Sequence, residues 1–194
     1  AQNTELKALN TLDELNATAL AQPAGKFAAL VKRLEHIGVG GKSPTRAVVF
    51  AERIATLTWL RDHLPKALGL RPENVAMLHG GLSDVEQQEI VDSFKLETSP
   101  IRVLVTGDVA SEGVNLHAQC HHLIHFDIPW SLIRIEQRNG RIDRYGQKHP
   151  PVISSLILEP SDPDFSGDLR VLSRLLEREN QAHKTLGDVA SLMG

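Results

Sequence analysis

The sequence has one cysteine, Cys120, among its 194 residues. A single thiol forms no intramolecular disulfide, which excludes the disulfide-stapled secreted domains and favours a reducing compartment. There is no apolar run near the roughly 18 residues of a membrane span, and no signal-peptide pattern opens the chain. The net charge of −3 argues against a uniformly basic nucleic-acid coat but leaves room for a local basic face. These absences predict a cytoplasmic protein without a membrane partner.

Short runs rich in Val, Ile and Leu alternate with amphipathic segments after residue 45. This alternation predicts an α/β fold with a mainly parallel sheet covered on both faces by helices. The expected parts are an N-terminal helical lead-in (1–40), the α/β core (41–159) and a C-terminal helical extension (160–194). We expect strands at 46–52, 74–80, 101–108, 122–129 and 151–158, and helices at 4–22, 25–37, 54–64, 83–96, 131–144 and 166–186.

Residues 137–147, QRNGRIDRYGQ, contain three arginines at a spacing of three: Arg138, Arg141 and Arg144. On the helix expected at 131–144 they would share one side. Several guanidinium groups on one face indicate a planar anionic partner. Ligands of parallel α/β sheets bind outside the carboxyl ends of the strands, so we expect the anion there.

The rest of a nucleotide site is missing from the sequence. GVGGKS, residues 38–43, imitates the end of a P-loop, but His36 stands where that pattern needs glycine. A helix precedes it and a strand follows it, the reverse of a P-loop, so we interpret it as a turn. Asp127 imitates a magnesium-binding aspartate at a strand end, but without a P-loop we interpret it as a turn former. The chain therefore holds no complete site for a nucleoside triphosphate.

A group of histidines with one cysteine offers the residue types of a zinc site: His117, Cys120, His121, His122 and His125. The sequence contains no paired Cys-x-x-Cys, and His121 and His122 are expected on opposite faces of a strand. We therefore favour packing at the strand entrance and assign no metal ligand. A metal-dependent hydrolase stays open as an alternative, which stoichiometric zinc in the purified chain would support.

Four segments, in order, resemble the second RecA-like lobe of superfamily-two helicases and translocases. Residues 47–60 resemble motif IV, residues 77–83 a turn that touches nucleic-acid backbone, residues 103–117 motif V and residues 137–147 motif VI. The leading Gln137 and the trailing Gly146-Gln147 resemble Swi/Snf-like ATPases, and residues 110–113, ASEG, are similar to their bacterial and phage branch. The resemblance covers most of the chain from Lys26 and implies a RecA-like three-layer α/β/α fold with flanking N- and C-terminal helices.

The resemblance implies that ATP is the nucleotide, with Mg²⁺ held mainly by a first RecA-like lobe. It implies that Arg141 and Arg144 are arginine fingers reaching the γ-phosphate, while Gln137 orients water or phosphate. Fingers of this kind supply about 10³ to 10⁵ in rate, or roughly 4 to 7 kcal/mol. The implied nucleotide-binding positions are Gly113 (a tight turn), Asn115 (the sugar), Gly140 (close approach of the backbone), Arg141 and Arg144.

The resemblance also implies contacts to a nucleic-acid backbone at Gly80, Ser83, Thr106, Gly107 and Ser111, and Arg53, just after the first expected strand, is a further candidate for such a contact. Ser83 and Glu86 form a predicted capping box, and the positive end of the following helix suits a phosphate. Gly107 departs from the family, which commonly has a hydroxyl residue there; a main-chain contact stays possible.

The resulting expectation is the C-terminal lobe of an ATP-dependent, Swi/Snf-like translocase on double-stranded DNA. Its expected partners are the first RecA-like lobe, DNA and further proteins of a larger complex, in a bacterial or phage-type cytoplasm or at the nucleoid. The sequence begins with Ala1 rather than Met, which suggests a piece of a longer protein, and we expect the isolated chain to be inactive. The alternative is a non-catalytic nucleic-acid- or protein-binding module that retains the helicase fold.

Overall fold

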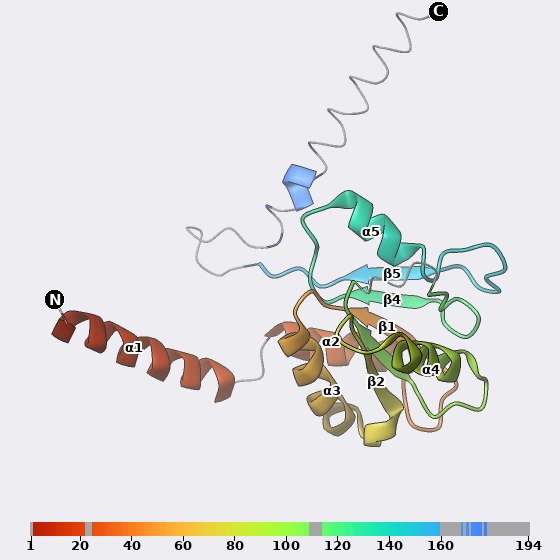
Figure 1. The fold of residues 1–194 in the computed structure, drawn as a ribbon, viewed down its shortest axis with the longest axis horizontal. Coiled ribbons are helices and arrows are strands. Elements are labelled where there is room, and N and C mark those ends of the chain that lie inside the picture. The colour runs from red at the N-terminus through yellow and green to blue at the C-terminus, as the bar shows by residue number, and fades with distance from the viewer. Residues whose placement is uncertain are drawn as a thin grey trace, which may run out of the picture.

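The computed structural model describes residues 2–21, 25–108 and 114–159, together with 168, 170, 172–175 and 177. In this part of the chain five strands form one parallel sheet of order β2-β3-β1-β4-β5 (Figure 1). The expected parallel sheet is confirmed, although each strand has four residues and is shorter than expected. The strands are β1 (Ala47–Phe50), β2 (Val75–Leu78), β3 (Val103–Thr106), β4 (His122–His125) and β5 (Val152–Ser155).

Helices cover both faces of the sheet, as the alternation predicted. Ala47 and Val49 of β1 pack in one cluster with α2 (Gly25–His36) and α3 (Ile54–Leu68). Val48 and Phe50 point to the other face and pack with α4 (Asp84–Lys95), whose Phe94 is fully buried. The three layers follow from this alternation of side chains along buried strands. A short 3₁₀ helix, η1 (Pro72–Asn74), leads into β2.

The flanking helices are described in part. The expected N-terminal helix is α1 (Gln2–Ala21), which extends away from the sheet in Figure 1. In the C-terminal segment, the described residues from 168 to 177 are helical, and Leu175 packs against Ile128 beside Leu132 and Ile135. The rest of the helix expected at 166–186 lies outside the described residues. No helix in the described part is long and apolar enough to cross a membrane.

The expected helix at 131–144 is wrong in its second half. The helix α5 (Leu132–Asn139) ends before Gly140. Beyond it, the N–H of Arg141 donates to the carbonyl of Arg138 three residues back, and the carbonyl of Arg141 accepts from the N–H of Leu116 at 3.0 Å. This bond to a distant segment replaces the continuation of the helix. The three arginines therefore do not share a helix face: Arg138 is buried, whereas Arg144 is exposed.

The P-loop-like residues 38–43 form turns between α2 and β1, as interpreted. Because they precede β1, they lie at the amino edge of the sheet, opposite to the edge where parallel α/β sheets bind ligands.

Candidate functional site

A pocket of about 860 Å³ opens where β1, β2 and β3 end, beside α5. The last residues of these strands, Phe50, Leu78 and Thr106, line its base. Its volume falls in the range of small-molecule sites. Four arginines and three carboxylates line it, which leaves one positive charge in excess: Arg134, Arg138, Arg141, Arg144, Glu52, Asp108 and Asp143.

The pocket brings together the residues predicted to act on the nucleotide. Gln137, Gly140, Arg141 and Arg144 all line it. Gln137 and Arg144 are exposed, and Arg141 is half-buried. A Cβ added at Gly140 would lie 3.3 Å from the carbonyl oxygen of Glu136, so a side chain there would press on the end of α5. Guanidinium groups at the mouth of an open pocket suit an anion brought by another surface.

The segments that resemble motifs V and VI contact each other through Arg141. Besides the bond from the N–H of Leu116, the Nη1 atom of Arg141 donates to the carbonyl of Val114 at 3.3 Å. Asn115 lies between these residues but is not part of the pocket lining, and its Oδ1 pairs with Nδ1 of His117. Its predicted contact with the nucleotide sugar stays a prediction. Gly113 and Ser111 lie outside the described residues.

Behind the pocket, Arg138 forms a buried ion-pair network that the spacing of arginines did not reveal. Its side chain is 1% exposed. Nε and Nη2 donate to the two carboxylate oxygens of Asp108 at 2.6 and 2.9 Å, and Nη1 donates to the main-chain carbonyl of Asp127 at 3.2 Å. Nη1 also lies 3.5 Å from Oδ1 of Asp127, and the guanidinium lies over the ring of Phe50. The guanidinium of Arg138 thus contacts the residues that follow β3 and β4.

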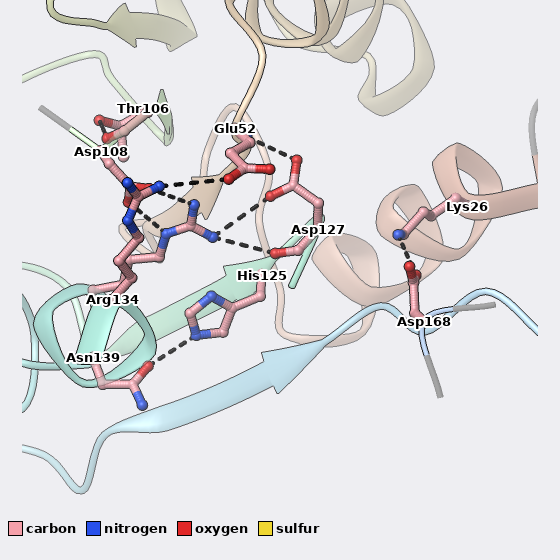
Figure 2. Close-up of polar contacts among 11 residues, drawn as sticks. Lys26, Glu52, Thr106, Asp108, His125, Asp127, Arg134, Asn139 and Asp168 are labelled. Atoms are coloured by element: carbon pink, nitrogen blue, oxygen red, sulfur yellow. Dashed lines mark hydrogen bonds and ion pairs between the residues drawn. The ribbon is translucent and has the colours of Figure 1, made fainter. Parts of the chain in front are cut away.

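The network continues to exposed side chains, and Figure 2 shows Arg134 beside Glu52 and Asp108. The exposed Arg134 lies 3.6 Å from a carboxylate oxygen of Glu52 and 3.8 Å from one of Asp108. Asp127, interpreted as a strand-end turn former, lies in the bend that follows β4, and its Oδ2 accepts the N–H of Glu52, two residues after β1, at 2.7 Å. A sequence signal existed, because an acid follows each of the three adjacent strands β3, β1 and β4 within two residues: Asp108, Glu52 and Asp127.

His125 is a further buried group beside the network. Its Nε2 pairs with Oδ1 of Asn139 at 2.9 Å (Figure 2), and its ring stacks on Phe50. Burial lowers the pKa of His125, and the nearby Arg138 lowers it further, while the bond with Asn139 opposes the shift. A neutral imidazole can accept a hydrogen bond at one nitrogen and donate at the other, so His125 helps to fix the end of α5.

The predicted nucleic-acid contacts divide into two groups. Arg53 and Ser83 are exposed at the starts of α3 and α4, and Gly80 is exposed in the loop before Ser83. The capping box is confirmed: Ser83 Oγ accepts the N–H of Glu86, and the N–H of Ser83 donates to a carboxylate oxygen of Glu86 at 2.8 Å. These residues follow β1 and β2, so they lie at the same sheet edge as the pocket but do not line it.

Thr106 and Gly107 line the pocket but have their own partners. Thr106 is 2% exposed, and its hydroxyl donates to the carbonyl of Gly107. The N–H of Gly107, the main-chain donor considered for a phosphate, donates to the carbonyl of Leu78 at 3.1 Å. A contact from these two residues would have to replace existing hydrogen bonds.

Two polar residues whose roles the sequence did not reveal join distant parts of the fold outside the pocket lining. The buried Arg46 donates to the carbonyls of Phe94, Leu96 and Glu97 at the C-terminus of α4. Gln147 donates through Nε2 to the carbonyls of Cys120 and Ile142, both at 2.9 Å. Neither role has a local sequence signal, because the partners lie between 5 and 51 residues away.

The histidine cluster does not gather at one place: Cys120, His121 and His122 lie at the amino end of β4, whereas His125 is the last residue of β4, at the carboxyl edge. The rings of His121 and His122 lie 4.0 Å apart, so the expectation that they occupy opposite faces is wrong. The strand β4 begins only at His122, and alternation does not apply to His121. Burial lowers the pKa of both rings, that of His122 to about 4. Cys120 is buried, and burial raises its pKa to about 12. Within the described ranges no three of these residue types are placed to hold a metal ion.

Comparison with protein families gives a match over the core of the chain. The family model described as "Helicase conserved C-terminal domain" matches residues 25–146. The protein named "Uncharacterized ATP-dependent helicase YqhH" of Bacillus subtilis (strain 168) is 25% identical over 182 residues, which are 94% of this chain and 30% of the relative. RNA polymerase-associated protein RapA of Vibrio cholerae (strain M66-2) is 33% identical over 110 residues, 57% of this chain and 11% of the relative. The chain spans less than a third of the length of either relative.

Solved structures show the same fold. The C-terminal part of the Fun30 ATPase domain is 25% identical, with a TM-score of 0.60 over 69% of this chain and 40% of that chain. Dbp5 of S. cerevisiae, bound to RNA and ADP BeF3, is 22% identical, with a TM-score of 0.59 over 80% of this chain and 36% of that chain. At this identity the likeness to Dbp5 shows the fold alone.

Proposed function

The chain belongs to the family of helicase conserved C-terminal domains, and on this premise we propose that it is the second lobe of an ATP-dependent, Swi/Snf-like translocase on double-stranded DNA. The RecA-like fold and the family expected from motifs IV to VI are confirmed. ATP use is supported by the name of the B. subtilis relative, an ATP-dependent helicase.

The observation that carries the proposal is the grouping of Gln137, Arg141 and Arg144 in one solvent-open pocket at the carboxyl edge of the sheet. Negative charge spreads over the phosphoryl oxygens during transfer, and an always-protonated guanidinium aimed at them lowers the barrier. Arg141 and Arg144 would supply these donors to ATP bound on a first lobe, and Gln137 would orient the attacking water or a phosphate oxygen.

Mg²⁺ would be held mainly by that first lobe. Among the carboxylates of the pocket, Asp108 is bonded through both oxygens to Arg138, and Glu52 lies beside Arg134. A cation would compete with these arginines, so the donor set here suits an anion better than a metal. When bound, Mg²⁺ would neutralise phosphate charge; this lobe would contribute guanidinium groups.

Contacts to DNA would come from exposed groups beside the pocket. Arg53 offers a charge, and Ser83 with Gly80 begins α4, whose positive end suits a phosphate. Ser111, which lies outside the described residues, would add a hydroxyl. Movement along DNA requires these contacts to differ between the ATP-bound and the released states. The expected setting is a bacterial or phage-type cytoplasm or the nucleoid, with further proteins as partners.

The test is DNA-stimulated ATP turnover of the full-length protein. Arg141→Ala should lower kcat by about 10³ or more, and Arg144→Ala by a comparable factor. The matched control is Arg61→Ala on α3, which should leave turnover unchanged because the Arg61 side chain is 41% exposed, pairs with Asp62 and does not line the pocket. The isolated chain should hydrolyse ATP negligibly. Unchanged turnover of both finger variants would support the non-catalytic module instead.

A further inference from the structure

The feature of interest is the buried guanidinium of Arg138, which contacts Asp108 and Asp127 at the ends of two strands. Resting on the proposed function, we propose that Arg138 is a positioning residue: held by Asp108 and Asp127, it fixes the main chain that carries Arg141 so that the Arg141 guanidinium points into the pocket. The proposed role acts through Arg141 and not through a contact between Arg138 and the nucleotide.

Arg138 is anchored to the sheet by groups from two strand ends. Its Nε and Nη2 atoms donate to the two carboxylate oxygens of Asp108, which follows β3. Its Nη1 atom donates to the main-chain carbonyl of Asp127, which follows β4, and forms an ion pair with Oδ1 of the same residue. The Cζ atom of Arg138 lies over the ring of Phe50, the last residue of β1, at 5.3 Å from the ring centroid. Because β3 and β4 flank β1, one side chain ties the carboxyl ends of three neighbouring strands to the last turn of α5.

The main chain of Arg141 is hydrogen-bonded directly to that of Arg138. Its N–H donates to the carbonyl of Arg138 at 3.1 Å, and the N–H of Gly140 donates to the carbonyls of Glu136 and Arg138. On the other side, Leu116 and Val114 bond to the carbonyl and Nη1 of Arg141. The turn that presents Arg141 is therefore held between the segment 114–116 and the Arg138 anchor.

Stability alone does not account for a charged anchor at this position. Buried ion pairs often contribute no more to stability than apolar residues of similar volume, because desolvation offsets the attraction. Apolar residues could fill the space beside Phe50, but they would not lock the direction of α5 relative to Asp108 and Asp127. A bidentate fork fixes direction as well as distance, and lysine, which presents a point charge, does not.

Arg46 provides an internal comparison. It is also a buried arginine, 4% exposed against 2% for Arg138, and it also lies over a phenylalanine ring, that of Phe94. It precedes β1 at the amino edge of the sheet and bonds only to carbonyls at the end of α4 among the contacts described. Replacing the Arg46 guanidinium should lower the stability of the fold without changing the position of Arg141.

The experiment is a double-mutant cycle in the full-length protein at saturating DNA. ATP hydrolysis is measured for Arg138→Lys, Arg141→Ala and the pair, with Arg46→Lys alone and paired with Arg141→Ala as control. Misplacing a catalytic group by about 1 Å costs up to about 10² in rate. We expect Arg138→Lys to lower kcat roughly 10- to 100-fold, with KM for ATP changed less than about threefold. In the Arg141→Ala background, Arg138→Lys should lower kcat by less than about twofold.

The outcomes separate the two proposals. If Arg138→Lys lowered kcat by the same factor in the parent and in the Arg141→Ala background, or did not lower it in the parent, the positioning role would be overturned. A large loss of kcat in Arg141→Ala would still support the proposed function in that case. If Arg141→Ala itself left turnover unchanged, the proposed function would fail. Arg46→Lys should change kcat less than about twofold in either background. If Arg138→Lys does not fold, Asp108→Asn, which keeps the shape of the carboxylate, replaces it in the same cycle. Its loss of kcat should likewise shrink to less than about twofold in the Arg141→Ala background.

Discussion

Replacing Arg46 by methionine tests how the buried polar frame of this fold is stabilised. The Arg46 guanidinium donates to the carbonyls of Phe94, Leu96 and Glu97, the last two at 2.7 and 3.0 Å. The last carbonyls of a helix have no partner within the helix, and a cation at this end also favours the helix dipole. Methionine keeps the aliphatic length and removes every donor.

The expected cost follows from the surroundings of each carbonyl. A hydrogen bond to a charged group contributes about 1.5 to 3 kcal/mol. Leu96 and Glu97 are exposed, so water can replace their lost bonds, whereas Phe94 is fully buried. We therefore expect about one full bond and part of two others to be lost, or about 2 to 4 kcal/mol of unfolding free energy. For a chain of this length, a loss of about 3 kcal/mol corresponds to a Tm roughly 6 to 12 °C lower.

Urea unfolding, followed by circular dichroism, measures this loss. The control is Arg61→Met, for which we expect a change below about 0.5 kcal/mol because the Arg61 side chain is 41% exposed and pairs only with the neighbouring Asp62 among the ion pairs described. A loss below about 1 kcal/mol for Arg46→Met would refute the reasoning, because it would mean that the carbonyls of α4 are satisfied without the guanidinium.

Three further outcomes are expected. Gly146 has a φ of 91°, and a Cβ there would lie 3.4 Å from Nε2 of His117, so Gly146→Ala should lower the free energy of unfolding in urea by about 1 to 2 kcal/mol. The control Gly25→Ala, where a Cβ on α2 would meet no atom within 4 Å, should not lower it. Burial, together with the charges of His121 and Arg33, lowers the pKa of His122 from 6.5 to about 4. Because the unfolded state takes up the proton at a higher pH than the folded state, the Tm should fall as the pH drops from about 6.5 towards 4. A Tm that stays level over this range in the parent, or that falls equally in His122→Asn, would contradict this assignment. Burial raises the pKa of Cys120 from 9.0 to about 12, so a disulfide reagent at pH 8 should label the folded chain at least roughly 10³-fold more slowly than the urea-unfolded chain; comparable rates would contradict its burial.

Local patterns were sufficient to predict the layers of the fold. The Val-rich strands around Val48 and Leu104 and the capping box of Ser83 and Glu86 rest on neighbouring residues, and they were confirmed. The family was predicted from residues 103–117 and 137–147, and it was confirmed as well. The expected boundaries at residues 40 and 159 stay predictions.

Long-range contacts account for the parts that the sequence did not reveal. The helix after Trp130 was extended too far because the bond between Leu116 and Arg141 joins segments 25 residues apart, and no local pattern contains it. For the same reason the spacing placed Arg138 beside Arg141 on one helix face but did not identify its acidic partner, the carboxylate of Asp108, which lies 30 residues earlier in the chain and beside which Arg138 is buried. Side-chain spacing identifies candidates for a helix face; it does not show which of them find a buried partner.

The most direct measurement is a structure of the full-length protein with DNA, Mg²⁺, ADP and a metal fluoride that imitates the γ-phosphate in transfer. We predict that the guanidinium groups of Arg141 and Arg144 lie within hydrogen-bond distance of the fluoride atoms, about 2.7 to 3.2 Å. Both side chains pointing into solvent, with the two lobes closed on the nucleotide, would contradict the assignment of this lobe as the source of the arginine fingers.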